Sequence, residues 1–274
     1  MKHIVRVTLS LLSVWFPHLG QSAQTLTIPQ VVDGGGWQST IVLTNSTLNP
    51  ASATLIFHSD KASGGVTQAW TPPFLETSST AGLSLKGGST MFLHTAGTAA
   101  ALTQGWAELN ADAGVIAYVV FTNRITGLRD QDGTAPAVAV TNRVLVPYDD
   151  ASGFATAIAV VNPTGAAQNI SVGFRATTGG VATASLPAVP PMGHMAFVLA
   201  QQFPAIAGHS GLAEFYDATG NFSMISLRFN PTQSFTEAPV YLQTGPAIIV
   251  ATPNPPPPTP DPYPYSIGTQ PPQR

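Results

Sequence analysis

WQSTIVLTNSTLNPASATLIF, residues 37–57, aligns without a gap with FATAIAVVNPTGAAQNISVGF, residues 154–174, at a constant offset of 117. Four aligned positions are identical: Ile41/Ile158, Asn45/Asn162, Thr47/Thr164 and Phe57/Phe174. The alternation of apolar residues is stronger than the identity, with Trp37, Ile41, Leu43, Ala53, Leu55 and Phe57 corresponding to Phe154, Ile158, Val160, Ile170, Val172 and Phe174. Period-two alternation on both sides of a turn predicts a pair of β-strands joined as a hairpin.

The repeat continues with shifted offsets along the rest of the chain. GSTMF (residues 88–92) corresponds to GHMAF (193–197), and GWAEL (105–109) corresponds to GLAEF (211–215). A repeat of this length is the size of a small domain and far longer than a solenoid unit. The sequence therefore predicts an all-β protein of two tandem immunoglobulin-like β-sandwich domains related by internal duplication, each closed around its own core.

The composition favours short strands joined by turns. Charged residues make up only 8% of the 274 residues, while Gly and Pro each number 25, a mix that disfavours long exposed helices. The hydrophobic content of 44% is too high for a disordered chain. With a net charge of −3 and no basic cluster, nucleic acid is excluded as a partner, and the absence of Cys excludes a disulfide framework.

Four segments are expected along the chain. Residues 1–23 predict a secretory signal peptide, with Lys2 and Arg6 before an apolar stretch that Pro17 interrupts, too short for a stable membrane span. Residues 26–142 and 143–244 form the two sandwiches, and residues 246–274 form a Pro-rich tail. Ten of the last 22 residues are Pro, which favours extended polyproline II, either as a spacer or as a ligand for an aromatic groove.

The alternation and turns predict sixteen strands and one helical turn. The strands of the first domain are expected at 25–32, 37–44, 53–59, 80–85, 89–95, 104–110, 114–123 and 136–141. Those of the second are expected at 143–147, 154–161, 168–175, 180–186, 194–199, 210–216, 222–229 and 237–242, with a helical turn at 201–205. Residues 61–80 are expected to be an insertion without a counterpart, and the short linker predicts two domains in contact.

Aromatic residues supply the candidate ligand site. Trp37 and Trp106 are replaced by Phe154 and Leu212 in the second copy, which predicts core packing for both. Trp70 has no counterpart and lies in the polar segment TQAWTPPF. It is expected to be the one partly exposed Trp, and with Phe74 it predicts either a sugar-stacking site or a cap over a sandwich end. Tyr148 is the third candidate ligand-binding residue.

Catalytic and metal chemistry find little support in the sequence. Glu108 and Glu214 hold equivalent places and are expected to meet an Arg such as Arg124 or Arg228, or to lie on a solvated face. There is no Cys nucleophile, no GxSxG and no HExxH, so no catalytic residue, metal site or cofactor is predicted. The acidic turns leave a loose calcium site open, although the EF-hand spacing fails. His58, which aligns with Arg175, is expected to be exposed.

The segments PQVVDGGGWQSTIVLTN (29–45), GHMAFVLAQQFPAIAGHSGLAEF (193–215) and LRFNPTQSFTEAPV (227–240) resemble those of a group of uncharacterised exported bacterial proteins with paired modules. The resemblance covers residues 26–242 and implies export and modularity, with no activity to carry over.

Together these observations predict a non-catalytic exported structural, adhesive or interaction protein of the bacterial envelope, cell surface, periplasm or exterior. The alternatives are a carbohydrate-binding module using Trp70 and Phe74 and, more remotely, a hydrolase with a site at the domain junction. The partner is expected to be a protein or polysaccharide surface, and self-association is left open.

Overall fold

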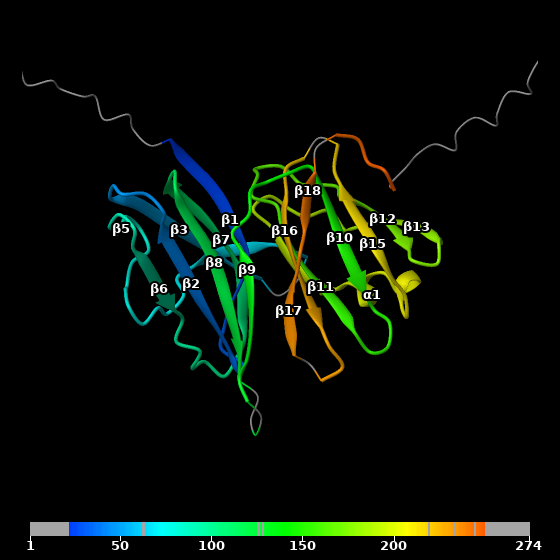
Figure 1. Cartoon of the computed structure of the whole chain (residues 1–274), viewed down its shortest axis with the longest axis horizontal. Coiled ribbons are helices and arrows are strands. Elements are labelled where there is room, and N and C mark those ends of the chain that lie inside the picture. The colour runs from blue at the N-terminus through cyan, green and yellow to red at the C-terminus, as the bar shows by residue number, and fades with distance from the viewer. Residues whose placement is uncertain are drawn as a thin grey trace, which may run out of the picture.

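The structure is a computed structural model, and it describes residues 22–249 except 62, 63, 125, 126, 128, 219, 233 and 244. The predicted signal peptide therefore lies almost entirely outside the described residues, and so does the predicted tail beyond residue 249. The described chain is all-β, and four antiparallel sheets form two layered units that lie side by side (Figure 1).

The first unit contains the strands β1 to β9. They are β1 (Ala23–Asp33), β2 (Trp37–Asn45), β3 (Ala51–Asp60), β4 (Thr67–Trp70), β5 (Leu83–Leu85), β6 (Thr90–His94), β7 (Thr103–Asp112), β8 (Val115–Asn123) and β9 (Gln131–Pro136). One sheet, the β1 sheet, has the order β1-β7-β3-β4 with β5 also paired to β3. The other, the β2 sheet, has the order β6-β2-β8-β9.

The second unit contains the strands β10 to β18. They are β10 (Arg143–Asp149), β11 (Ala155–Val161), β12 (Ser171–Ala176), β13 (Val181–Ser185), β14 (His194–Val198), β15 (Ser210–Tyr216), β16 (Ser223–Phe229), β17 (Phe235–Ala238) and β18 (Tyr241–Gln243). The predicted helical turn is present as α1 (Leu199–Gln202) and the 3₁₀ turn Pro204–Ile206. The β10 sheet has the order β13-β12-β15-β10-β18, and the β11 sheet has the order β14-β11-β16-β17.

Two turns that follow β2 and β11 are built from the same contacts. The side-chain amide of Asn45 donates to the carbonyls of Asn49, Leu85 and Lys86, and that of Asn162 donates to the carbonyls of Ala166, Val189 and Pro190. The carbonyl oxygens of both Asn side chains accept from the backbone and hydroxyl of the Thr two residues later. Two of the four identical pairs in the sequence are thus explained, because an Asx turn needs these side chains.

The predicted hairpins at 37–57 and 154–174 are wrong. After the Asn turn the chain crosses from one layer to the other, so β2 and β3 belong to different sheets, as do β11 and β12. Apolar alternation is preserved because both strands still face one core, with Ile41 and Leu43 on one side and Leu55 and Phe57 on the other. A pattern of period two specifies the buried face of each strand and leaves their pairing open.

Three further sequence predictions need correction. β9 occupies 131–136 instead of 136–141, where Val138 and Thr141 form isolated bridges to Thr27 and Phe222. The expected insertion at 61–80 contains β4, which pairs with β3 as β13 pairs with β12. GSTMF and GHMAF are one residue out of register, because Thr44 pairs with Thr90 while Val161, its counterpart, pairs with His194.

The two units share part of their interior. Ala159, Ile225 and Phe235 of the second unit belong to the same buried cluster as the core of the first. The ring of Phe235 packs on the backbone of Gly133, where an added Cβ would lie 2.3 Å from it. The outer face of the β11 sheet thus covers the open side of the first unit, and the expectation that each sandwich closes its own core is wrong for the first. The predicted contact between the units is confirmed.

Candidate binding surface

Trp70 and Phe74 lie together at one end of the first unit. The Phe57 ring contacts both, with ring centroids 6.2 Å from Trp70 and 5.3 Å from Phe74. Both side chains are half-buried against the first core. This arrangement matches the cap that the sequence offered as the alternative to a sugar site. Trp70 is not the one partly exposed Trp, because Trp37 is half-buried as well.

Tyr148 lies in the second core, away from Trp70 and Phe74. It is 3% exposed and contacts the ring of Phe174 edge-on at 5.9 Å between centroids. Burial raises the pKa of its phenol. The structure therefore brings together two of the three predicted ligand-binding residues and places the third in a different core.

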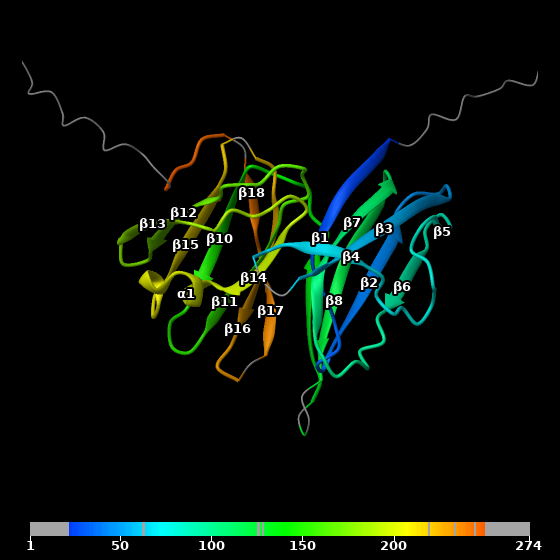
Figure 2. The same ribbon diagram turned by 180° about the vertical axis from the view of Figure 1, so that it is seen from behind.

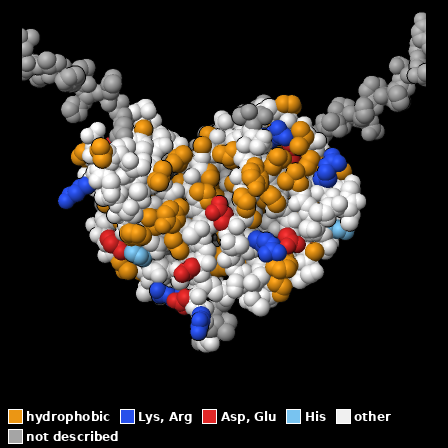
Figure 3. All heavy atoms as spheres, in the orientation of Figure 1, with side chains coloured by type: hydrophobic (Ala, Val, Ile, Leu, Met, Phe, Trp, Pro, Cys, Tyr) orange, Lys and Arg blue, Asp and Glu red, His pale blue; other side chains and the backbone are white. Residues whose placement is uncertain are grey.

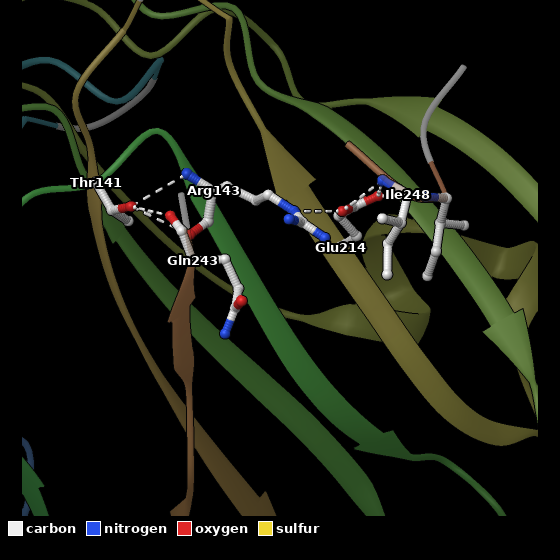
Figure 4. Close-up of polar contacts among 6 residues, drawn as sticks. Thr141, Arg143, Glu214, Gln243 and Ile248 are labelled. Carbon is white, nitrogen blue, oxygen red and sulfur yellow. Dashed lines mark hydrogen bonds and ion pairs between the residues drawn. The ribbon is translucent and has the colours of Figure 1, made fainter. Parts of the chain in front are cut away.

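Glu214 is buried in a structural network (Figure 4). Its carboxylate lies 2.7 Å from Nε of Arg143 on the adjacent strand β10 and accepts hydrogen bonds from the backbone N–H groups of Ile248 and Ile249. The hydroxyl of Thr141 donates to the carbonyl of Gln243 at 3.0 Å and thereby holds β18 beside β10. The sequence predicted an Arg partner but the wrong one, since Arg228 pairs with Asp149 at 2.7 Å. This buried, neutralised carboxylate anchors the C-terminal segment.

Glu108 has a different environment although it holds the equivalent place in the first unit. It is half-buried and accepts a hydrogen bond from the side chain of Asn110. Within the described part of the chain no ion pair joins it to an Arg, and Arg124 instead lies 3.7 Å from Asp130. The two carboxylates are therefore structural groups in separate sheets and form no acid–base pair with each other.

The junction between the units contains an Asp–His pair beside a cleft of about 590 Å³. Nδ1 of His194 lies 2.8 Å from Oδ1 of Asp60, and Gln104 donates to the other carboxylate oxygen at 3.0 Å. The His194 side chain is fully buried, and its Nε2 contacts neither solvent nor a hydrogen-bond partner. A general base needs access to the proton that it removes, so this pair is arranged to join β3 to β14 (Figure 2).

Trp106 and His58 extend the same contact between the units. Their rings stack at 4.5 Å with 14° between the planes, on the outer face of the β1 sheet. The indole N–H donates to the carbonyl of Met192 at 3.2 Å, and the hydroxyl of Thr67 donates to that carbonyl at 2.6 Å. Trp106 is fully buried, but at the junction instead of in the sandwich core as predicted. The prediction of an exposed His58 is wrong, since it is half-buried and burial lowers its pKa against the opposing effect of Glu108.

The outer face of the β2 sheet remains uncovered in the first unit (Figure 3). We call it the platform and define it by three rows across β6, β2 and β8: Thr90–Thr44–Ile116, Phe92–Val42–Tyr118 and His94–Thr40–Val120. Phe92, Ile116 and Tyr118 are 50%, 59% and 40% exposed. Val42 is only 2% exposed because the rings of Phe92 and Tyr118 flank it on both sides.

The platform is hydroxyl-rich and nearly uncharged. The hydroxyls of Thr44 and Thr90 lie 3.0 Å apart, and the rings of Phe92 and His94 lie roughly parallel. At the rim, Nδ1 of His94 lies 2.5 Å from Glu76. Burial alone would raise the pKa of that carboxyl, but hydrogen bonds from the backbone and ring of His94 outweigh it and lower the pKa. Aromatic rings among hydroxyls give a surface for apolar and polar contact together.

The platform escaped the sequence analysis because its residues are far apart in the chain. Phe92 and Tyr118 meet only through β2, which lies between β6 and β8. Along each strand an exposed residue is followed by a buried one: the exposed Phe92 by the buried Leu93, and the exposed Tyr118 by the buried Val119. The available signal was a large apolar residue at a solvent-facing position of β6 and of β8, next to a buried residue in each strand.

The acidic turns are used within the protein. Asp33 accepts the backbone N–H of Gly97 at 2.7 Å, and Asp150 accepts that of Gly208 at 3.0 Å. The carboxylate of Asp132 accepts the hydroxyl of Thr122 at 2.6 Å. Across the residues that the structure describes, no three His, Asp or Glu side chains group as a metal site would require.

Comparison of the sequence with protein-family models gives no match, and comparison with curated proteins gives none either. The resemblance to uncharacterised exported bacterial proteins therefore stays a prediction. No helix within the described residues has the length and hydrophobicity to cross a membrane.

Proposed function

We propose that the chain is a non-catalytic exported interaction protein, structural or adhesive, whose contact surface is the platform. The observation that carries this proposal is the exposure of Phe92, Tyr118 and Ile116 on one sheet face. Large apolar side chains gathered on a sheet face favour contact with a partner. The buried ionisable groups at the junction and beneath the C-terminal segment serve as internal ties, as the Asp60–His194 and Arg143–Glu214 pairs illustrate.

We also propose that the two units arose by duplication of one module. The strand orders β1-β7-β3-β4 and β6-β2-β8-β9 correspond to β10-β15-β12-β13 and β14-β11-β16-β17. The two Asn turns support this, and so do Gly105 and Gly211, since a Cβ at either would lie 1.9 or 2.1 Å from a carbonyl oxygen of the neighbouring strand.

Support for an immunoglobulin-like order within each module is partial. The pairs β2–β6 and β3–β7 match the B–E and C–F pairs of that fold. However, β1 pairs with β7 and β8 pairs with β2, so the first and last of these strands lie in the opposite sheets. We propose an immunoglobulin-related sandwich with its terminal strands exchanged between layers.

A carbohydrate-binding module is the second candidate, at the platform instead of at Trp70. Exposed rings can lie against the apolar faces of sugar rings, while Thr40, Thr44 and Thr90 offer hydroxyls to the sugar hydroxyls. The low charge of this face favours a neutral polysaccharide over an acidic one.

A binding survey with the full chain tests both candidates. The double variant Phe92→Ala/Tyr118→Ala is compared with wild type in polysaccharide pull-downs and against immobilised surface proteins. Tyr241→Ala is the matched control, because Tyr241 is a 50% exposed aromatic residue on β18. We expect the double variant to lose a partner that wild type and Tyr241→Ala retain.

The pattern of loss separates the alternatives. Loss of polysaccharide binding in the double variant supports the carbohydrate candidate, whereas loss of a protein partner supports adhesion. Loss with Trp70→Ala and retention with the double variant would contradict the platform and restore the original candidate site. Export is tested separately by N-terminal sequencing of chain recovered outside the cytoplasm.

A further inference from the structure

The cleft of about 590 Å³ at the junction is walled by both units. The first unit contributes the β3–β4 hairpin and the start of β7, and the second contributes β14 and α1. The hairpin extends to β14, where the carbonyl of Gly65 accepts the backbone N–H of His194 at 3.0 Å (Figure 2). Ligand sites of about 300–1,000 Å³ occur preferentially at interfaces of this kind, so the cleft has the size and the position of such a site.

Amides and hydroxyls predominate among the polar side chains of the cleft. They are the side chains of Ser59, Gln68, Thr103, Gln104 and Gln202. Besides the enclosed His194, the ionisable side chains that line the cleft are Asp60 and the exposed Lys61, and their charges are opposite. The carboxylate of Asp60 is already bound to His194 and Gln104. The lining therefore suits an uncharged molecule that both donates and accepts hydrogen bonds.

Most of this hydrogen-bonding capacity is unused among the residues that the structure describes. The side chains of Gln68, Thr103 and Gln202 form no hydrogen bond there, and Gln104 uses only an N–H of its amide. Ser59 is 4% exposed, and its hydroxyl has no partner in this described part of the chain either. That hydroxyl is not enclosed by the protein, so a molecule in the cleft can reach it. A nearly buried polar group without a partner costs free energy, which a ligand that pairs with it recovers.

The second unit shows that the fold itself does not require the hydroxyl of Ser59. Ser59 lies opposite Gly105 in the pair β3–β7, and Ala176 lies opposite Gly211 in the equivalent pair β12–β15. The copy that borders the cleft thus carries a hydroxyl where the other copy carries only a methyl group. This difference indicates a role for the hydroxyl outside folding.

We propose that the junction cleft binds a neutral disaccharide segment of a carbohydrate. The cleft is roughly four times as large as the cavity of about 150 Å³ that admits a benzene ring, which leaves room for two sugar rings. Sugar hydroxyls donate and accept hydrogen bonds, as the amides of Gln68 and Gln202 do, and each amide can bond to two of them. The half-buried ring of Phe197, on the second-unit wall, offers apolar contact to the C–H face of a sugar ring.

This site is separate from the platform and does not rest on the function proposed for it. Gln68 lies on β4 of the first unit and Gln202 on α1 of the second, so a molecule held by both side chains contacts both units. Its binding stabilises the contact between the units, and the thermal unfolding temperature rises with ligand concentration.

Titrations of the full chain with cellobiose, maltose and lactose test the assignment, and digalacturonate is the acidic comparator. Binding is followed by calorimetry and by the methyl resonances of Leu102 and Met195, which line the cleft. We expect at least one neutral disaccharide to shift both resonances at millimolar concentration and to bind more tightly than digalacturonate.

Two neighbouring glutamines of α1 provide a matched pair. Gln202 lines the cleft, whereas Gln201 is exposed outside it. We expect Gln202→Ala and Gln68→Ala each to weaken binding about fivefold, the equivalent of one neutral hydrogen bond, and Gln201→Ala to leave it unchanged. Ser59→Ala should weaken binding without loss of folding, because Ala176 holds the equivalent position in the second unit.

Four results would overturn the proposal. Two concern the ligand: no methyl shift with any of the three neutral disaccharides at millimolar concentration, or tighter binding of digalacturonate that Lys61→Gln abolishes. Two concern the site: equal weakening by Gln201→Ala and Gln202→Ala, or loss of disaccharide binding in the double variant of the platform. Retained disaccharide binding in that double variant, together with loss of its surface partner, would show that the cleft and the platform are independent sites.

Discussion

The β2 sheet and the β11 sheet occupy the same place in the two units, yet only one of them has its outer face free. In the β2 sheet this face carries Thr40 and Val42, and in the β11 sheet the matching positions carry Ala157 and Ala159. Alanine lets the first unit approach the β11 sheet closely, whereas the rings beside Val42 fill that space. The size of the outward side chains thus decides whether a sheet face becomes an internal contact or an exposed surface.

A second difference lies on the opposite layer. The outer face of the β10 sheet is covered by the C-terminal segment through Glu214, while that of the β1 sheet is covered by the junction through Trp106 and His58. The β1 and β10 sheets are therefore both covered on their outer faces, but the cover comes from a different part of the chain in each unit. Substitutions at matched positions should expose this asymmetry.

Glu214→Ala and Glu108→Ala should give the largest contrast. Removing Glu214 leaves the Arg143 charge buried and frees two backbone N–H groups, which costs roughly 3–5 kcal/mol of unfolding free energy. Glu108 is half-buried and bound to Asn110, so its removal costs less than about 1 kcal/mol. Urea unfolding of both variants measures the difference.

Equal losses in these two variants would show that the carboxylates have the same role in both units. A matched control is Arg143→Met, which removes the positive charge of the Arg143–Glu214 pair and leaves the carboxylate of Glu214 in place. It should also destabilise the protein and should release Ile248 and Ile249 to hydrogen exchange.

Ala159→Glu and Thr40→Glu test the free and covered faces. At Ala159 the carboxylate enters the shared core without a partner, and we expect a loss of roughly 3 kcal/mol or separation of the units. At Thr40 it points to solvent, and the change stays within about 0.5 kcal/mol. Chemical unfolding and small-angle scattering measure stability and separation. A stable, compact Ala159→Glu variant would contradict the shared core.

The sequence was sufficient to predict most of the strands, with β4 and β9 as exceptions, because alternation reports the buried face of each strand. The cores confirm this, as Leu55 and Phe57 are buried in the same core as Ile41 and Leu43. Strand pairing could not be predicted, since the Asn turn that carries the chain between layers has the same alternating flanks as a hairpin turn. The register at Thr90 failed for a related reason, because a short match tolerates a shift of one residue.

Burial at the junction was the other unpredictable feature. Trp106, His58 and His194 are buried by residues from the other unit, so their own strands carry no trace of it. Aligning the two copies even misled the prediction for His58, because Arg175, its counterpart, is exposed. Aligning the two copies shows only the features that both copies have. At the junction each copy contributes a different surface, so the alignment gives no sign of this contact.

Gly105→Ala and Gly211→Ala should show where the units remain alike. A Cβ would meet the carbonyl oxygen of His58 at 1.9 Å or that of Arg175 at 2.1 Å, so the paired strands must move apart. We expect similar losses of roughly 1–3 kcal/mol, measured by thermal unfolding. Gly165→Ala is the control, because nothing lies within 4 Å of its added Cβ. Clearly unequal losses would indicate that one of the two strand pairs, β3–β7 or β12–β15, can move apart to accommodate the added Cβ more easily than the other.

The smallest expected effect is a pH dependence at the junction. Burial lowers the pKa of His58 and is the larger of two influences. The negative charge of Glu108 is the smaller one and raises that pKa. Since the unfolded chain binds a proton more readily, stability is full above the unfolded pKa of about 6.5 and falls as the pH drops toward the folded value.

His58→Phe separates this contribution from the other acid-sensitive groups. Phenylalanine can keep the stack on Trp106 without titrating, so the variant should lose less stability than wild type between about pH 7.5 and pH 5.5. Glu76 does not interfere, because hydrogen bonds from His94 lower its pKa and its stabilisation is lost only in more acidic solution. A His58→Phe curve parallel to the wild-type curve would contradict a contribution of His58 to the pH dependence of stability.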